Sequence, residues 1–279
     1  MAVTLYSGQI TGIHATPISV EVDISPGLHI FSIVGLADKE IQEARERISA
    51  AIKNLGALPP HKKSQRVIVN LAPADVKKEG PAFDVPIALG YLLASDQISF
   101  NPEGKMFLGE LGLDGAVRKI SGVLPLAAVA GAAGFEELIV PKGNGTEASL
   151  IEGLRVIEIG TLMEIIDYLE GRTVREPARP GPRAPNPISA IDFRDVKGQE
   201  KAKRALIIAA AGGHNILMTG PPGGGKTILA RALPGILPPL SFEESIEVTK
   251  IHSIAGLLSD ETPYIAYPPF RNPHHTSSH

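Results

Sequence analysis

A glycine-rich segment with one lysine has the residue types and spacing for phosphate chemistry. Residues 220–227 read GPPGGGKT and match the pattern G-x-x-x-x-G-K-[ST] in full. Glycines let backbone N–H groups converge on phosphate oxygens, a lysine can reach the β- and γ-phosphates, and a threonine hydroxyl can bind Mg²⁺. The segment therefore predicts a site for a nucleoside triphosphate, with Thr227 as the metal-ligating residue. The predicted nucleotide-binding residues are Gly220, Pro221, Pro222, Gly223, Gly224, Gly225, Lys226 and Thr227.

The elements around this segment must hold the loop at the start of a helix. We expect a helix over 199–211, a short buried strand over 214–219 and a helix over 227–236. A strand, a glycine-rich loop and a helix in this order are typical of a βα unit in an open parallel sheet. Ser241 and Glu244 have the spacing of a capping box and predict the start of a further helix.

Hydrolysis of a bound nucleotide needs acidic residues that the glycine-rich segment over 220–227 does not contain. In such sites an acidic residue holds Mg²⁺ and a partner activates water, and the sequence signature of the acidic residue is an apolar strand ending in Asp-Glu. After Lys226 the acidic pairs are Glu243-Glu244, which begins a predicted helix, and Asp260-Glu261, which follows no strand of sufficient length. We therefore expect these 279 residues to bind nucleotide without hydrolysing it on their own.

Two segments resemble those of a known family. Residues 192–227 closely resemble the start of the AAA+ module in the magnesium-chelatase-like ATPases of the ComM/YifB family; they read DFRDVKGQEKAKRALIIAAAGGHNILMTGPPGGGKT. Residues 268–279, PPFRNPHHTSSH, look like its PFR-x-PHHT motif. The resemblance implies ATP and Mg²⁺ as ligands and places Val196 and Gly198 near the adenine. An ordinary helix start is the alternative for these two residues.

The resemblance also implies partners and leaves three functions open. Intact relatives are expected to be homohexameric ATPases, and ComM-like proteins are associated with DNA branch migration during natural transformation. A chelatase-like ATPase that remodels a partner protein is the second interpretation, and a nucleotide-binding module without turnover is the third. Because the resemblance stops inside the ATPase module, we expect a C-terminally truncated member or an incomplete gene model.

The N-terminal part resembles the Lon-protease-like domain of this family. A Ser-Lys protease needs a serine oxygen and a lysine amine within hydrogen-bond reach. In KKEGPAFD, Ala82 follows Gly80-Pro81 where Lon-like proteases have their serine, and the segment GELGLDGAVRKISGVL puts Leu124 at the lysine position. Lys119 follows the preceding turn too closely to substitute without a register shift. We therefore expect no protease activity.

A proline-rich stretch separates the predicted domains. Five prolines between residues 177 and 187 disfavour helix and sheet, so we expect a linker that acts as a tether or, through its arginines, as a basic arm. The predicted fold class is α/β, with an N-terminal ribosomal S5 domain 2-like (Lon-protease-like) α+β domain followed by the start of a P-loop AAA+ α/β domain. The predicted boundaries are 1–171 for the Lon-protease-like domain, 172–188 for the linker and 189–279 for the partial AAA+ domain.

Periodicity and turn residues predict the elements of the N-terminal domain. Asp38 is placed to cap a helix whose apolar residues recur at three and four, and Gly56 is placed to end it. A mostly apolar helix is expected over 84–94, and Thr161 with Glu164 forms a capping box for the last helix. Strands are predicted over 18–22, 29–34, 66–71, 106–111, 135–140 and 155–159.

Composition narrows the class of protein. Lys and Arg number 27 against 30 Asp and Glu, so the formal net charge is −3. Any contact with nucleic acid must therefore come from local basic patches or from assembly, and Lys62-Lys63 and Lys77-Lys78 are candidates for such patches. The absence of cysteine excludes disulfides and cysteine nucleophiles. The first residues lack a signal-peptide pattern, and the most apolar stretch, 123–133, is too short to span a membrane. We expect a cytoplasmic protein without a membrane partner.

Overall fold

The computed structural model describes residues 2–181, 191–259 and 262–271. By their contacts the residues divide into two compact units. Unit 1 contains Met1–Gly181 with Lys250–Asp260, and unit 2 contains Pro182–Thr249 with Glu261–His279. The domain boundaries at residues 171 and 188 stay a prediction.

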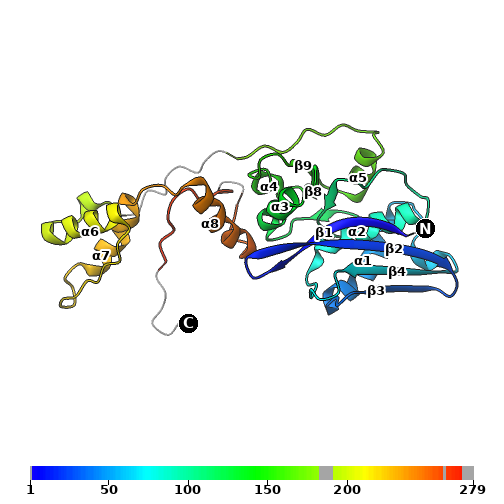
Figure 1. Cartoon of the computed structure of the whole chain (residues 1–279), viewed down its shortest axis with the longest axis horizontal. Helices are drawn as coiled ribbons and strands as arrows, with labels where there is room; N and C mark the ends of the chain where they lie inside the picture. The colour runs from blue at the N-terminus through cyan, green and yellow to red at the C-terminus, as the bar shows by residue number, and fades with distance from the viewer. Residues whose placement is uncertain (1, 182–190, 260–261, 272–279) are drawn as a thin grey trace. The chain divides into compact units, whose positions relative to one another are not determined.

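A four-stranded sheet is the larger sheet of unit 1 (Figure 1). Its strands follow the order β1-β2-β4-β3 and are antiparallel, except that β3 and β4 run parallel. Because successive side chains point to opposite faces of a strand, Val20 and Val69 are fully buried, whereas Asn70 donates a 2.9 Å hydrogen bond to Glu21 on the other face. The bounds are β1 (Val3–Thr11), β2 (His14–Pro26), β3 (Ile30–Val34) and β4 (Gln65–Ala72).

Two helices, α1 (Lys39–Asn54) and α2 (Asp84–Ala94), pack their apolar side chains into the core beneath this sheet. Asp38 caps α1 as predicted, since its carboxylate accepts a 2.8 Å hydrogen bond from the Ile41 N–H. The apolar residues of α1 that recur at three and four are buried, which confirms an amphipathic helix. Helix α2 is buried on nearly all sides, as its apolar sequence predicts.

A smaller parallel sheet, β5-β8-β9, completes unit 1 together with a two-stranded ribbon, β6-β7. An apolar cluster that includes Met106, Leu138 and Val156 fills the space around this sheet and α3. The remaining bounds in unit 1 are η1 (Pro60–Lys62), η2 (Pro81–Phe83), β5 (Lys105–Phe107), β6 (Glu110–Leu111), β7 (Val117–Arg118), α3 (Val123–Ala132), β8 (Glu137–Pro141), α4 (Gly145–Ala148), β9 (Arg155–Ile159) and α5 (Leu162–Leu169).

Unit 1 differs from the predicted elements in several places, and the short elements β7 and α4 are among those that were not predicted. The strand predicted over 106–111 is split into β5 and β6, because the chain leaves the sheet at Gly109, which donates its N–H to the Ala82 carbonyl. Strand β1 has no predicted counterpart, since its buried positions include the polar Ser7 and Gln9. Helix α3 has none either, because it is apolar all around and shows no amphipathic period. The other predicted strands and helices of this domain are confirmed, with shifts at their ends.

Unit 2 consists of helices and connecting segments in its described residues. The buried strand predicted over 214–219 is wrong, because these residues form no regular structure and Leu217 is 87% exposed. A strand needs ladder hydrogen bonds from a neighbour, and the described part of unit 2 contains no strand that could supply them. The bounds are η3 (Phe193–Asp195), α6 (Glu200–Gly212), α7 (Lys226–Ala232), η4 (Leu233–Ile236) and α8 (Phe242–Ile254), whose residues from Lys250 onward are assigned to unit 1.

The predicted capping box at the start of α8 is confirmed in both directions. The Glu244 N–H donates to Ser241 Oγ at 3.2 Å, and the Ser241 N–H donates to the Glu244 carboxylate at 2.8 Å. These two bonds satisfy backbone donors that the helix itself leaves without partners. None of the described helices combines the length and apolar character that a membrane span requires.

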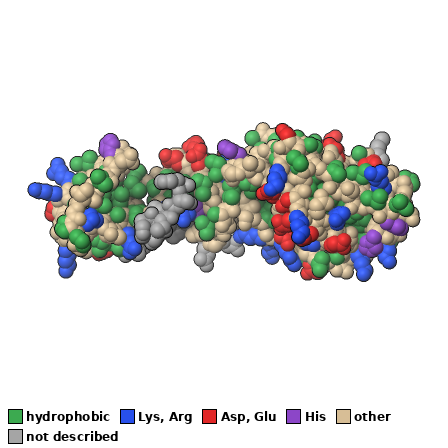
Figure 2. Space-filling view, turned by 90° about the horizontal axis from the view of Figure 1, so that it is seen from below, with side chains coloured by type: hydrophobic (Ala, Val, Ile, Leu, Met, Phe, Trp, Pro, Cys, Tyr) green, Lys and Arg blue, Asp and Glu red, His purple; other side chains and the backbone are tan. Residues whose placement is uncertain are grey.

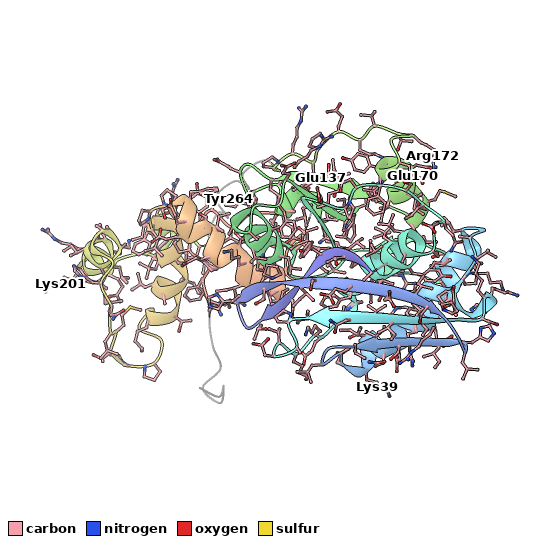
Figure 3. All side chains as sticks on the ribbon, turned by 45° about the vertical axis from the view of Figure 1, so that its right-hand side comes forward. Lys39, Glu137, Glu170, Arg172, Lys201 and Tyr264 are labelled. Atoms are coloured by element: carbon pink, nitrogen blue, oxygen red, sulfur yellow. The ribbon has the colours of Figure 1, made fainter. Side chains whose placement is uncertain are left out.

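The first part of the predicted linker packs on unit 1. The Ala178 N–H donates to the Val156 carbonyl at 2.8 Å. Arg172 pairs with Glu170 at the end of α5 (Figure 3), and Arg175 pairs with Glu164 at 2.8 Å. Two of the arginines considered for a basic arm are thus engaged in ion pairs. Residues 182–188 and most of the motif over 268–279 lie outside the described residues.

Candidate nucleotide-binding site

The predicted phosphate-binding loop leads directly into α7, whose first residue is Lys226. Lys226 Nζ donates to the carbonyl oxygens of Gly220 at 3.0 Å and Pro221 at 2.8 Å. The loop therefore curves around the lysine ammonium. Thr227, the predicted Mg²⁺ ligand, is exposed beside the lysine in the first turn of the helix.

Two glycines set the turn that begins α7. Gly223 has a φ of +77° and Gly225 a φ of +84°, a region in which a side chain costs about 1 kcal/mol or more. Gly225 is the N-cap of the helix, and the Gly224 N–H donates to the Pro221 carbonyl at 3.3 Å. The space beside Gly223 is open, because a Cβ there would meet no described atom within 4 Å. The loop backbone is thus shaped by glycine and accessible to a ligand.

A cavity of about 300 Å³ adjoins the loop. Leu206 of α6, residues 216–219 and the loop residues Gly224 and Lys226 are among its lining. This volume lies at the lower end of the range of small-molecule sites. Gln199, just before α6, also lines the cavity and donates from Nε2 to the Gly224 carbonyl at 3.3 Å. The sequence pattern missed Gln199, because the contact joins residues far apart in the chain and only its position ahead of a predicted helix could have pointed to it.

The two residues predicted to lie near the adenine have different surroundings. Val196 is 5% exposed and packs with Leu206 and Leu229 in the small core of unit 2. Gly198 is exposed and has a φ of +67°. Neither is among the residues that line the cavity, although Leu206 connects Val196 to its wall. A contact of either residue with adenine stays a prediction.

Thr227 supplies an oxygen ligand of the kind that Mg²⁺ takes in phosphate sites. Mg²⁺ there usually keeps several waters and binds few protein oxygens besides those of the substrate phosphates, so a hydroxyl beside the phosphate loop fits its donor set. The lining of the cavity includes no carboxylate, and in the described ranges no three His, Cys, Asp or Glu residues gather as a metal site. Glu243-Glu244 lies in the first turn of α8, and Asp260-Glu261 lies outside the described residues.

A second cavity, which lies within unit 1, is lined by two of the three residues compared with a Ser-Lys protease. This cavity is about 330 Å³ in volume, and Ala82 and Lys119 are both among its lining. Leu124 is fully buried on α3 rather than exposed in the cavity. The fold thus brings Lys119 to the same cavity as Ala82, whose methyl group offers no nucleophilic oxygen.

Two family models match the chain in separate segments. “Subunit ChlI of Mg-chelatase” matches residues 20–144, and “Magnesium chelatase, subunit ChlI” matches residues 192–279. The first match lies in unit 1, and the second contains the phosphate-binding loop.

Individual relatives match almost the whole chain. An uncharacterized protein of Mycobacterium tuberculosis (strain H37Rv) is 43% identical over 274 residues, 98% of this chain and 54% of the relative. The uncharacterized protein YifB of Escherichia coli (strain K12) is 42% identical over 268 residues, 96% of this chain and 52% of YifB. Competence protein ComM of Haemophilus influenzae is 39% identical over 281 residues, 98% of this chain and 54% of ComM. The chain spans about half the length of these relatives.

These matches agree with the mixed α/β architecture and with the phosphate-binding loop. The predicted fold class is confirmed by the mixed and parallel sheets of unit 1 and by the family matches. Both matching models describe the same subunit of magnesium chelatase, and the identity to YifB and ComM extends through both segments. The chain therefore belongs to the magnesium-chelatase-like AAA+ family that includes ComM and YifB.

Proposed function

We propose that this chain binds ATP with Mg²⁺ through the loop at residues 220–227. The supporting observation is the position of the Lys226 ammonium, 2.8–3.0 Å from two loop carbonyls and next to an open glycine backbone. Phosphate oxygens are stronger partners for an ammonium than neutral carbonyl oxygens, because the hydrogen bond then joins two opposite charges. The lysine can therefore exchange its carbonyl partners for the β- and γ-phosphates.

The residues around the loop would divide the recognition of the nucleotide. Backbone N–H groups of Gly223, Gly224 and Gly225 would hold phosphate oxygens, and the Thr227 hydroxyl would ligate Mg²⁺. Bound Mg²⁺ supplies positive charge that offsets the charge of the phosphates. Leu206 in the wall of the neighbouring cavity offers apolar surface to the nucleoside.

Titration with fluorescent mant-ATP in the presence of Mg²⁺ tests this proposal. Lys226→Ala should weaken binding at least about tenfold, because a charge-assisted hydrogen bond contributes about 1.5–3 kcal/mol. Lys201→Ala is the matched control, since Lys201 is exposed and extends outward from α6 (Figure 3). Equal affinity of the wild type and Lys226→Ala would overturn the proposal.

We further propose that the intact protein is a cytoplasmic, hexameric, ATP-driven motor that acts on DNA in natural transformation. The 39% identity to Competence protein ComM over nearly this whole chain supports this role. Hydrolysis also needs an acidic residue at the end of an apolar strand, and the sequence after Lys226 contains no apolar strand that ends in Asp-Glu, so this chain alone should show no turnover. Turnover by the chain that disappears in Lys226→Ala would contradict that expectation.

A chelatase-like ATPase that remodels a partner protein is the second candidate, supported by the magnesium-chelatase description of both family models. The ATPase rate of a full-length relative such as YifB, measured with and without forked or single-stranded DNA, separates the two candidates. Stimulation by DNA is expected for the motor. A rate that DNA does not change would exclude the motor and favour the chelatase-like function.

A further inference from the structure

A basic pocket lies at the start of β3 in unit 1, far in sequence from the nucleotide-binding loop. Its volume is about 330 Å³. The lining comes from the start of β3, from one face of α1 and from η1, which the fold brings together from three separate parts of the chain. The lining residues are His29, Ile30, Phe31, Arg45, Glu46, Ser49, Pro60 and His61.

Side chains of α1 donate hydrogen bonds to the outer edge of β3 beside this pocket. Arg45 Nη1 donates to the Phe31 carbonyl at 3.2 Å, and Gln42 Nε2 donates to the Ile33 carbonyl at 2.9 Å. Since β4 is the one strand that pairs with β3 among the described residues, these carbonyls point away from the sheet, and the N–H of the same residues points the same way. Arg45 Nε also donates to the Gln42 carbonyl at 2.8 Å, which fixes the guanidinium beside the strand edge.

Positive charge gathers around the pocket. Lys62 and Lys63 directly follow the lining residue His61 and are exposed, and the exposed Arg66 is the register partner of the lining residue Ile30. Within the described ranges, none of these three residues or Arg45 has a carboxylate within ion-pair distance. Figure 2 shows blue and purple side chains together at its right-hand end, where Figure 1 places the start of β3 and β4. Among the lining residues Arg45 is the cation and Glu46 the carboxylate, and the exposed Lys62, Lys63 and Arg66 add positive charge outside the lining, although the whole chain has a net charge of −3.

Flat rings accompany these charges. His29 and His61 are exposed, and Phe31 is half-buried in the lining. Cations that follow a phosphate backbone, together with rings on which bases can stack, are the combination that binds single-stranded nucleic acid. A closed duplex keeps its bases stacked inside and could use only the charges.

We propose that the basic pocket binds single-stranded nucleic acid, with phosphates on Lys62, Lys63 and Arg66 and a base against His29 or His61. The inference names a contact for the DNA partner proposed above and rests on that proposal for its biological role. Binding itself does not depend on the nucleotide site, because all of these residues belong to unit 1.

Fluorescence anisotropy of the full 279-residue chain with a labelled oligothymidylate of about 20 nucleotides tests the inference. With three phosphate contacts, log K against log salt concentration should fall with a slope of about −2. The double variant Lys62→Glu/Lys63→Glu should bind at least about tenfold more weakly with a shallower slope. The double variant His29→Ala/His61→Ala should bind about fivefold or more weakly with the slope retained.

The double variant Lys53→Glu/Lys142→Glu is the matched control, because it makes the same change of net charge at exposed sites outside the pocket. This control should bind within about twofold of the wild type if the charges act locally. Three results would overturn the inference: no binding by the wild type, an equal loss in the control, or tighter binding to duplex DNA or to phosphatidylglycerol vesicles. Titration of every variant with mant-ATP keeps the two proposals apart, since pocket variants should bind ATP normally.

Discussion

Asp84 is a buried carboxylate at the start of α2 and allows a quantitative test of the core of unit 1. Its side chain is 1% exposed and accepts hydrogen bonds from Arg47 Nε at 2.8 Å, from Arg47 Nη2 at 3.0 Å and from the Leu111 N–H at 3.1 Å. Burial raises the pKa of Asp84 from 3.8 to about 6, although the hydrogen bonds and charge of Arg47 act to lower it. The folded state therefore keeps its proton to a higher pH than the unfolded chain does.

The raised pKa of Asp84 fixes the sign of a pH effect on stability. The contribution is fully present below the pKa of the unfolded chain, 3.8, and is lost as the pH rises through about 6. A shift of roughly two pKa units corresponds to about 3 kcal/mol. Asp84→Asn keeps the size of the side chain but cannot titrate. The free energy of unfolding of the wild type minus that of Asp84→Asn should therefore fall by about 2–3 kcal/mol between about pH 4 and pH 8.

Urea denaturation followed by far-ultraviolet circular dichroism at several pH values measures this difference. The comparison of two variants at each pH removes the contribution of every other titrating group that the substitution leaves unchanged. Asp23→Asn, at an exposed position of β2, is the control and should show no comparable change with pH. A difference that stays constant with pH, or that rises as the pH rises, would refute the assignment of a raised pKa to Asp84.

Two further substitutions test other polar contacts of unit 1. Asp38→Ala removes the cap that accepts from the Ile41 N–H and should lower the free energy of unfolding by about 1 kcal/mol in urea. Lys78 is fully buried, donates to the Pro73 carbonyl, and has a pKa lowered by burial. Because a buried charge is costly, Lys78→Met should leave the free energy of unfolding in urea unchanged or raise it. A decrease of more than about 1 kcal/mol in this free energy would show that the ammonium stabilises the fold.

Elements with a local signal could be predicted from the sequence of unit 1. Helix α1 has its cap, its apolar period and its final glycine within one short segment, and α2 has the bounds that the apolar run predicts. Strand β1 could not be found this way, because Ser7 is buried by tertiary contacts and its hydroxyl donates to the Ala82 carbonyl, far along the chain. A strand whose buried residues are polar shows no alternation of apolar and polar residues.

The candidate sites also differ in how far they could be predicted from the sequence. The phosphate-binding loop is contiguous in sequence, so the pattern GPPGGGKT identifies it before any fold is known. Gln199 joins the loop only through a tertiary hydrogen bond to Gly224. The basic pocket is assembled from β3, α1 and η1, and the pair Lys62-Lys63 in the sequence pointed only to the residues that follow its lining residue His61. Sequence patterns therefore predict sites made of neighbours in the chain, and the fold is needed for sites made by packing.

The charge distribution of the chain fits a protein that must both hold and release nucleic acid. A strongly basic chain would bind phosphate backbones tightly at every stage of a cycle. Here the net charge is −3, and the proposal gives the basic pocket about three phosphate contacts, which physiological salt weakens substantially. Such contacts are weak in one subunit but become strong when several copies bind the same strand, because each later contact is intramolecular. In the proposed ring, several weak and reversible contacts would thus add up to strong binding of one strand. A change in the arrangement of the subunits could then release the strand.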